Sequence, residues 1–487
     1  MLELMMIYWP YCLAALSFIF GLTAAVHVAM TKKEVRTAIG WVGVLILSPI
    51  LGSIIYSMIG VNRIRRKTVT LHRRKASHFG QFHMRTYDVP VKFVRKKFGR
   101  YGVFMKKLGD KVNPCYQKSG NEIHILRGGD QAYNAILSAI EKAERSIFLE
   151  TYIFDHDEIG KKIVKALADA VKRRVVVRVL IDAVGARYSF PSIVHVLKKH
   201  GVQVGIFNGN IIIGLRLPYA NLRTHRKIII IDGKYAFTGG MNIRAGCSVS
   251  LSGMRAFHDV HFCVKGPVLQ DLFHVALEDW AFASGETLNA DLWSIPSPLL
   301  PSGKGMFVRV VSSGPDDRNM GINHRMLLGA FSTAERSILI KTPYLLPDRE
   351  LVSALVTAAR RGVRVNIVVP DKNNLRLVDR AMHAQFDQLV RDNCRIWRSY
   401  GPFDHSKLIS IDNYWVYIGT SNVDPRSLRL NFEIDLEVMD RKFAKAIAYD
   451  IRCSIENARE IKLGDLEKRP FFSRLLDHIV WLGSPYL

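Results

Sequence analysis

Acidic residues and clustered cysteines are both scarce in this sequence of 487 residues. Asp and Glu total 43 against 69 Lys and Arg, which gives a formal net charge of +26. So large a positive charge indicates which partners a protein binds rather than which fold it adopts. Nucleic acid and anionic lipid are the two candidate polyanionic partners. The six cysteines are scattered and form no Cys-x-x-Cys or Cys/His cluster. This pattern argues against a zinc site and favours free thiols in a reducing compartment.

Charged residues are missing altogether from two long apolar stretches, residues 4–30 and 37–61. Each exceeds the roughly 20 residues that a membrane span needs, so residues 1–61 are predicted to form a two-helix transmembrane hairpin. A signal peptide fits the first stretch poorly, because it has no basic region before it and is too long. A buried hairpin of a soluble protein is the other alternative.

Basic residues on either side of the second stretch predict the orientation of the hairpin. The sequence "NRIRRKTVTLHRRK" after it is far more basic than the loop "TKKEVR" before it. The positive-inside rule therefore places both termini and the main body in the cytoplasm of a bacterial cell, although Lys32, Lys33 and Arg36 argue weakly for the reverse. Residues 62–120, basic and interleaved with aromatics, are expected to lie on anionic headgroups, at about 1 kcal/mol per basic residue. A solvated linker and a nucleic-acid arm are the alternatives.

The remainder of the chain is a duplication. "AERSIFLETYIFDHDEIGKKIVKALADAVKRRVVVRVLID" begins at Ala143, and "AERSILIKTPYLLPDRELVSALVTAARRGVRVNIVVPD" begins at Ala334. Each has the pattern of a strand, an amphipathic helix and a second strand, which is a βαβ unit. The sequence thus predicts an α/β fold of two pseudo-symmetric lobes, residues 121–300 and 301–487, each a mixed sheet flanked by helices.

Each lobe carries one matched set of titratable residues, His225, Lys227 and Asp232 in the first and His405, Lys407 and Asp412 in the second. Residues two apart in a strand share a face, so each His and Lys are expected to project together. The Asp should close a tight turn after the apolar strand. The returning strand then brings small residues back beside the His: Gly239, Gly240 and Asn242, or Gly419, Ser421 and Asn422. Such residues leave room for a substrate and can present backbone N–H groups to an anion.

Two complete HxK…D sets of this kind resemble the signature of the phospholipase D superfamily. The chain is similar over its whole body, and closer still to bacterial cardiolipin synthases, through "PILGSIIYSMIG", "DW" at Asp279, "LNFEI" at Leu430 and the terminal "RPFFSRLL…SPYL". The resemblance implies phosphatidyl transfer without metal or cofactor. One phosphatidylglycerol would pass its phosphatidyl group to another, through a phosphatidyl-histidine, to give cardiolipin and glycerol.

The residue types fit this chemistry. A neutral imidazole is a competent nucleophile, a protonated one can serve the leaving alkoxide, and lysines can neutralise the non-bridging oxygens. We expect His225 as nucleophile and His405 as acid/base, although the symmetric pattern leaves the reverse open. Each motif Asp would serve its lobe structurally or electrostatically. An acidic residue further along in each copy, Asp259 and Glu433, is expected to orient a ring, or else is an ordinary surface carboxylate.

Two rival functions remain open at this level. A phospholipase D-type hydrolase or another phosphatidyltransferase would use the same site, and the apolar insert at residues 206–219 is either lipid-facing or a buried strand pair. A membrane-tethered nuclease or nucleic-acid binder would suit the charge, but the two spans favour lipid. The expected partners are phosphatidylglycerol and anionic membrane lipids, with no nucleic acid. The prediction that carries the rest is that the two imidazoles, one from each lobe, converge on one phosphorus atom.

Overall fold

The computed structural model describes residues 2–32, 34–60, 85–208, 222–288, 293, 300–315 and 319–484. Within them, residues 2–60 belong to one compact unit and residues 85–484 to another. The basic run after residue 61, most of the insert at 206–219 and the last three residues lie outside the described residues.

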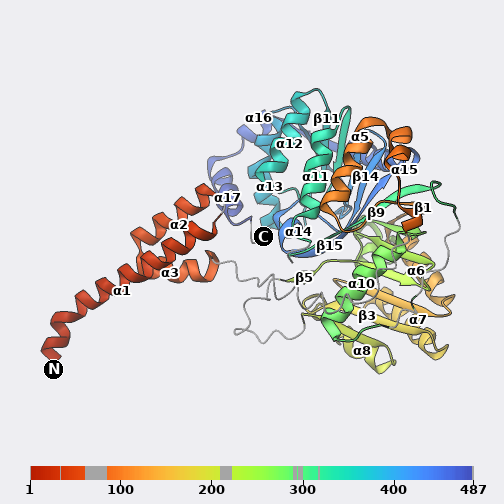
Figure 1. The fold of residues 1–487 in the computed structure, drawn as a ribbon, viewed down its shortest axis with the longest axis horizontal. Coiled ribbons are helices and arrows are strands. Elements are labelled where there is room, and N and C mark those ends of the chain that lie inside the picture. The colour runs from red at the N-terminus through yellow and green to blue at the C-terminus, as the bar shows by residue number, and fades with distance from the viewer. Residues whose placement is uncertain are drawn as a thin grey trace. The chain divides into compact units, whose positions relative to one another are not determined.

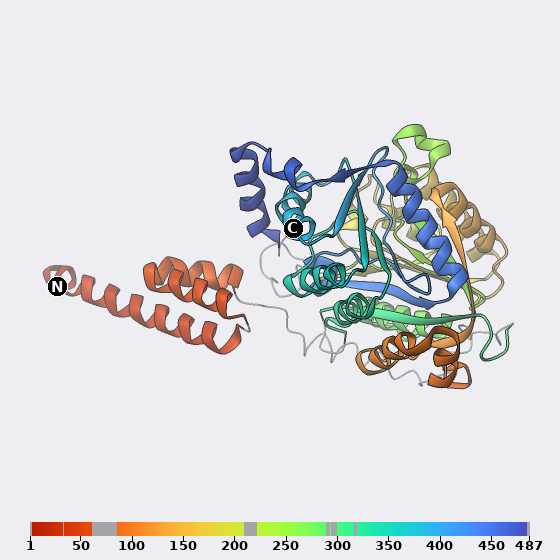
Figure 2. The ribbon, with the colours of Figure 1, turned by 90° about the horizontal axis from the view of Figure 1, so that it is seen from above.

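The first unit is helical throughout. It consists of α1 (Leu2–Thr31), α2 (Val35–Leu47), α3 (Pro49–Ile55) and a π-helical turn (Tyr56–Gly60). Residues Tyr8–Thr31 of α1 make a helix of 24 residues that is long and apolar enough to cross a membrane. The short loop to α2 returns the chain along α1, which confirms the predicted helix pair (Figure 1; Figure 2).

The second predicted span differs from a single helix. Ser48 has φ −144° and ψ 76°, so α2 stops after 13 residues and α3 begins anew at Pro49. Proline at the first helical position lacks only a donor that would be unpaired there, whereas inside a helix it would clash with the preceding turn. The uncharged stretch 37–61 is long enough for a single helix, but the helix is interrupted at Ser48.

The second unit is one sixteen-stranded sheet in two halves related by pseudo-symmetry. From the centre outwards, the first half runs β1 (Lys118–Arg127), β8 (Val260–Lys265), β7 (Tyr235–Gly239), β6 (Ile228–Ile231), β2 (Ser146–Thr151), β3 (Val176–Asp182) and β4 (Gln203–Phe207). The second half runs β9 (Met306–Ser313), β15 (Asn431–Met439), β14 (Trp415–Gly419), β13 (Leu408–Ile411), β10 (Ser337–Lys341), β11 (Arg364–Pro370), β12 (Arg395–Ser399) and β16 (Ala458–Ile461). The halves join where β1 pairs with β9, so the sheet is continuous (Figure 1).

The predicted βαβ units are confirmed in both halves. Strands β2 and β3 are parallel neighbours joined through α7 (Glu158–Lys172), and β10 and β11 are joined through α12 (Arg349–Arg360). Each helix starts where sequence chemistry predicts, since Asp157 accepts from the N–H groups of Ile159 and Gly160, and Asp348 accepts from that of Leu351.

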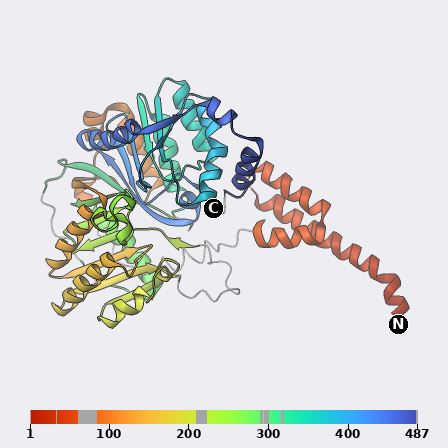
Figure 3. The ribbon, with the colours of Figure 1, turned by 180° about the vertical axis from the view of Figure 1, so that it is seen from behind.

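Helices cover both faces of each half. In the first half, Ile147 and Leu149 pack into a core with α6 (Gly128–Glu141) and α7, while Phe148 between them contacts Trp280 of α10 (Leu269–Ser284) on the other face. The second half places α11 (Ile322–Thr333) and α12 on one face and α15 (Arg441–Glu456) on the other (Figure 1; Figure 3). Strands buried on both faces explain the near-continuous apolar runs of the sequence.

Most of the described part of the basic segment 62–120 is a helix, α5 (Val91–Val112), kinked at Gly99 where φ is 71°, and contact of this segment with headgroups stays a prediction. Val94, Phe98 and Met105 are buried in the core of the second half, and the Phe98 ring contacts Phe307. These apolar residues therefore form a packing face, and most basic residues of α5 are exposed, whereas Lys106 is buried and pairs with Asp110 at 2.6 Å.

Candidate active site

Both histidines of the paired motifs lie just before the strand that carries their isoleucines or leucines, and the other lobe holds each one in place. The backbone N–H of His225 donates to the carbonyl of Phe432 at 2.9 Å, where β5 (Arg223–Thr224) pairs with β15 of the second lobe. The N–H of His405 donates to the carbonyl of His258, in the first lobe, at 2.7 Å. Each lobe thus supplies backbone pairing for the histidine of its partner.

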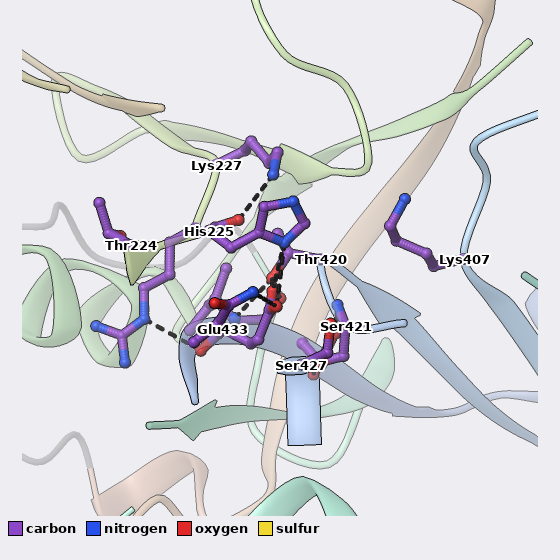
Figure 4. A network of polar contacts seen from close by, with 12 residues as sticks. Thr224, His225, Lys227, Lys407, Thr420, Ser421, Ser427 and Glu433 are labelled. Atoms are coloured by element: carbon purple, nitrogen blue, oxygen red, sulfur yellow. Dashed lines mark hydrogen bonds and ion pairs between the residues drawn. The ribbon is translucent and has the colours of Figure 1, made fainter. Parts of the chain in front are cut away.

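The carboxylates are exchanged in the same way. His225 Nδ1 lies 2.9 Å from Glu433 Oε2 (Figure 4). His405 Nδ1 lies 3.0 Å from Asp259 Oδ2. The sequence predicted both carboxylates as ring-orienting groups, and the register confirms that they are equivalent, since His261 opposes Gly239 and Asp435 opposes Gly419. What the sequence did not predict is that each one crosses to the other lobe.

Such a carboxylate fixes the tautomer. It accepts a hydrogen bond from Nδ1–H, which leaves the lone pair of Nε2 free and directed away from the carboxylate. Both Glu433 and Asp259 are almost fully buried, so they act on the ring without competition from water.

The surroundings of the two carboxylates differ. Glu433 also accepts from Thr420 Oγ1 at 2.5 Å and from Asn431 Nδ2 at 3.2 Å, two contacts that the sequence analysis did not anticipate. The first-lobe equivalent of Thr420 is Gly240, where a Cβ would lie 2.3 Å from Asp259 Oδ1. Gly240 therefore leaves space for the Asp259 carboxylate. It lies at the site, as predicted for a supporting residue, and its part in substrate binding stays a prediction.

The motif lysines are buried beside their histidines. Lys227 Nζ donates to the carbonyl of His225 at 2.8 Å, and Lys407 Nζ lies 3.0 Å from His405 Nδ1 and also donates to that residue's carbonyl. Burial lowers the pKa of Lys227 to about 7 and also lowers that of Lys407. A bound phosphodiester would reverse this effect, because it places a negative charge beside both ammonium groups.

The two sets share one electrostatic site. Burial lowers the pKa of His225 well below its usual value, and the charges of Lys227 and Lys407 lower it further. Burial, followed by the charge of Lys407, lowers the pKa of His405 to about 4, and Lys227 of the other lobe contributes in the same direction. Charges from both motifs therefore act on both rings, as convergence on one substrate requires.

The carboxylate pKa values break the symmetry. Burial raises the pKa of Glu433 to about 7, against the charge of Lys227. Burial also acts to raise the pKa of Asp259, but the hydrogen bond with His405 and the charge of Lys407 outweigh it and leave that pKa below its usual value. Asp259 is thus a fixed negative charge at neutral pH, whereas Glu433 titrates in this range.

The motif aspartates lie at the opposite end of the strand from the histidines. Asp232 accepts from the backbone N–H groups of residues 144–146 at 2.8–2.9 Å, and Asp412 accepts from those of residues 335–337 at 2.8 Å. Both have positive φ and lie in the tight turn that joins the two strands of their hairpin, so the predicted turn is confirmed. They fasten the hairpin to the start of the βαβ unit and do not reach the reacting groups.

Three other predicted supporting residues are held in hydrogen bonds or buried. Asn242 Oδ1 accepts from the N–H of Ile153 at 3.2 Å, and Ser421 donates to Asp435 through both its N–H and its hydroxyl. The amide oxygen of Asn422 is buried and has no hydrogen-bond partner among the residues that the structure describes. Their part in substrate binding stays a prediction.

Aromatic rings that the sequence analysis did not single out line the histidines. Tyr152 contacts the His225 ring edge-on at 5.4 Å between centroids, and Tyr344 and Phe403 contact His405 at 6.2 and 5.9 Å. Tyr152, Tyr344 and Phe403 lie in the segments that follow β2, β10 and β12. Functional residues are common at the ends of strands, and this position was the signal that could have identified them. In the described part of the chain, no three His, Cys, Asp or Glu side chains are grouped to hold a metal ion.

Comparison with known proteins matches residues 136–252 and 327–452 to the model of a family described as "Cardiolipin synthase, PLD-like domain". The chain is 30% identical to a cardiolipin synthase of Alkalihalophilus pseudofirmus, over 98% of this chain and 95% of that one. It is 31% identical to one from Halalkalibacterium halodurans, over 94% and 90% of the two chains.

Among solved structures, the phosphatidylserine synthase of Haemophilus influenzae shares the fold, with a TM-score of 0.58 at 16% identity over 79% of this chain and all of that one. This structure shows the fold alone, and the near full-length relatives give the family. The chain belongs to the cardiolipin synthase family of phospholipase D-like phosphatidyltransferases.

Proposed function

We propose that this protein transfers the phosphatidyl group of one phosphatidylglycerol to the hydroxyl of a second, giving cardiolipin and glycerol through a phosphatidyl-histidine. The observation that carries the proposal is the crosswise site, in which two imidazoles from different lobes each keep Nε2 free and share two lysines. The substrates are anionic phospholipids, and nucleic acid is not among them.

In the first step, Nε2 of His225 attacks phosphorus while Glu433 accepts from Nδ1. The P–O bond to glycerol breaks, and His405 gives its proton to the departing alkoxide. Lys227 and Lys407 neutralise the non-bridging oxygens as charge develops on them. The negative phosphodiester also raises the pKa of His405 from its value in the empty site, so that this ring holds the proton that it must donate.

In the second step, a free hydroxyl of another phosphatidylglycerol attacks the phosphohistidine. His405 takes the proton of that hydroxyl, the P–N bond breaks, and cardiolipin is released with His225 regenerated. The unequal carboxylates support this assignment of the two histidine roles. Ionised Asp259 favours a protonated His405, whereas Glu433, whose pKa of about 7 leaves it only partly ionised at neutral pH, leaves His225 neutral and nucleophilic.

The proposed location is the inner membrane of a bacterial cell, with α1 as anchor and the active site on the cytoplasmic side. The basic sequence that follows residue 61 supports this orientation. A hydrolase would use the same groups with water in place of the second lipid. Incubating the purified protein with labelled phosphatidylglycerol alone separates the two, since cardiolipin plus glycerol supports the synthase and phosphatidic acid plus glycerol supports the hydrolase. Chelators should leave the rate unchanged, and a loss that one added metal restores would contradict the mechanism.

The histidine roles can be tested with a leaving group that needs no acid. With phosphatidyl-p-nitrophenol as donor, His405→Ala should still release p-nitrophenol in a burst and accumulate lipid on His225, whereas His225→Ala should release none. A burst from His225→Ala with none from His405→Ala would reverse the roles, and bursts from both would refute the histidine nucleophile.

A further inference from the structure

The C-terminal helix α17 (Phe471–Leu482) turns an apolar face to solvent. Its exposed large apolar residues recur at helical spacing: Phe471, Phe472, Leu475, Leu476, Ile479 and Leu482. Phe472 is 81% and Leu482 is 73% exposed. An isolated exposed apolar residue needs no explanation, but a continuous stripe along a helix marks an interaction surface.

The opposite side of α17 is fixed to the protein, so this stripe cannot turn inward. Asp477 is buried and forms ion pairs with Arg380 of α13 (Arg376–Val390) at 3.1 Å and with Arg469 at 2.6 Å. Val480 and Trp481 pack against the core of the second lobe. The helix therefore lies beside α13 with only its outer face unpartnered among the described residues (Figure 1).

A second group of exposed apolar residues lies on α13, the helix that α17 packs against. Leu375 and Leu377, at the start of α13, are also exposed and follow the carboxyl end of β11. That is the sheet edge at which Tyr344 follows the parallel strand β10 and contacts His405. Exposed cations flank the apolar residues: Lys372, Arg376, Lys468 and Arg474.

We propose that α17 and the start of α13 form a docking surface for an anionic lipid bilayer, with the apolar stripe at the boundary between headgroups and acyl chains. An apolar face flanked by cations is the composition of helices that lie in this boundary. A helix so placed brings the adjoining sheet edge to the lipid headgroups. The proposal deepens the proposed function, because it states how the site reaches its lipids, and its first test requires no turnover.

That test uses the wild-type chain in anionic vesicles that contain a phospholipid with a photoactivatable group on its acyl chain. Mapped crosslinks should fall on residues 471–482 as well as on α1, which serves as the internal control. Crosslinks on α1 with none on α17 would overturn the proposal. This outcome does not depend on whether the protein makes cardiolipin.

The second test compares Phe472→Glu with Tyr449→Glu, which places the same charge at an exposed aromatic of α15 that is 66% exposed. Burial of a phenylalanine changes a partition equilibrium roughly tenfold or more. Phe472→Glu should therefore lower turnover of vesicle phosphatidylglycerol several-fold but spare turnover of a short-chain, monomeric phosphatidylglycerol. Tyr449→Glu should change neither. Equal losses on both substrates, or conversion of a dimer to a monomer with vesicle turnover intact, would show a folding or self-association surface instead.

A separate observation concerns the path of the first unit. Lys32 Nζ donates to the carbonyl of Gly60 at 2.6 Å, His27 Nδ1 lies 2.8 Å from the Tyr56 hydroxyl, and Ser53 Oγ donates to the carbonyl of Phe20 at 3.1 Å. The segment from α3 to Gly60 therefore runs alongside α1 in the same direction and ends level with the end of α1.

The lengths agree with this path. At 1.5 Å per residue, the 13 residues of α2 reach about 20 Å, less than the roughly 30 Å of a bilayer core. The turn at Ser48 keeps its backbone groups paired, since its N–H donates to Val44 and its carbonyl accepts from Gly52. Paired groups are the condition for a turn inside a membrane.

We infer that α1 crosses the membrane and that α2 and α3 enter it and return to the same side, which places the N-terminus on the outer side. This topology removes a conflict in the sequence. Lys32, Lys33 and Arg36 and the basic run after residue 61 all come to lie on one side, as the positive-inside rule favours.

Epitopes at the two ends of the full chain test this topology in intact spheroplasts. External protease should remove the N-terminal epitope and spare the C-terminal one, and lysis should expose both. Protection of both epitopes would restore the two-crossing hairpin, and loss of the C-terminal epitope would place the active site outside.

Discussion

Replacing Asp259 by asparagine should disable a histidine of the other lobe. The substitution keeps the shape of the side chain but removes the charge that lies 3.0 Å from His405 Nδ1. Two unit charges about 4 Å apart interact by about 4 kcal/mol at an effective dielectric constant of about 20. If His405 is protonated in the transition state, kcat should fall by about a thousandfold.

The leaving group distinguishes a positioning role from a structural one. Because the proton of His405 matters little to a good leaving group, the loss caused by Asp259→Asn should shrink for p-nitrophenol release and stay large for glycerol release. Asp271→Asn is the matched control. It removes a buried carboxylate of the same lobe, paired with Lys118 at 2.7 Å, and should affect thermal stability rather than the rate ratio. A loss below tenfold, or one equal for both leaving groups, would refute the crosswise role of Asp259.

Three further predictions concern protonation, hairpin attachment and lobe docking. Lys227, with a pKa of about 7, is charged below that pH and neutral above it, whereas Glu433, with a pKa also near 7, becomes charged as the pH rises through the same range. If both charges are needed, kcat/KM should follow a narrow bell-shaped curve against pH. Lys227→Arg should then move only the alkaline side of that curve to higher pH. Asp412→Ala should lower the free energy of unfolding by about 2–3 kcal/mol with little change in kcat of the folded protein, because it removes three backbone hydrogen bonds distant from the reacting groups. Thermal unfolding and initial rates measure the two effects, and a large loss of kcat with unchanged stability would contradict this prediction. Asp279→Ala should destabilise by about 3–5 kcal/mol, since it leaves Arg226 buried without its carboxylate, and an unfolding midpoint equal to that of wild type would count against this.

The sequence predicted the local parts of the site well. The turn at Asp232, the small residues of the returning strand and the pairing of each Lys with its His all follow from spacings of a few residues. Such short-range geometry is set by strand periodicity and turn chemistry, which a single sequence carries.

The pairing of each histidine with a carboxylate of the other lobe could not be predicted from the sequence. His225 and Glu433 are 208 positions apart, and His405 and Asp259 are 146 apart. A repeat unit shows which residues are equivalent, but it does not show whether a carboxylate serves its own copy or the other one. The break at Ser48 was missed for a different reason, because an uncharged run measures length and hydrophobicity, not continuity of the helix.

The crosswise arrangement makes lobe docking and site assembly a single event. Besides the two histidines, Arg226 reaches from the first lobe to the carbonyl of Glu433 at 3.1 Å and to Ser312 Oγ at 2.7 Å. These contacts fix the segment between the histidine and lysine of the first motif onto β15 and β9 of the second lobe. Neither lobe alone would then hold its histidine in a defined tautomer, because the carboxylate and the backbone carbonyl that accepts from the histidine N–H would both be absent. A substitution that loosens the junction should for this reason reduce turnover before either lobe unfolds.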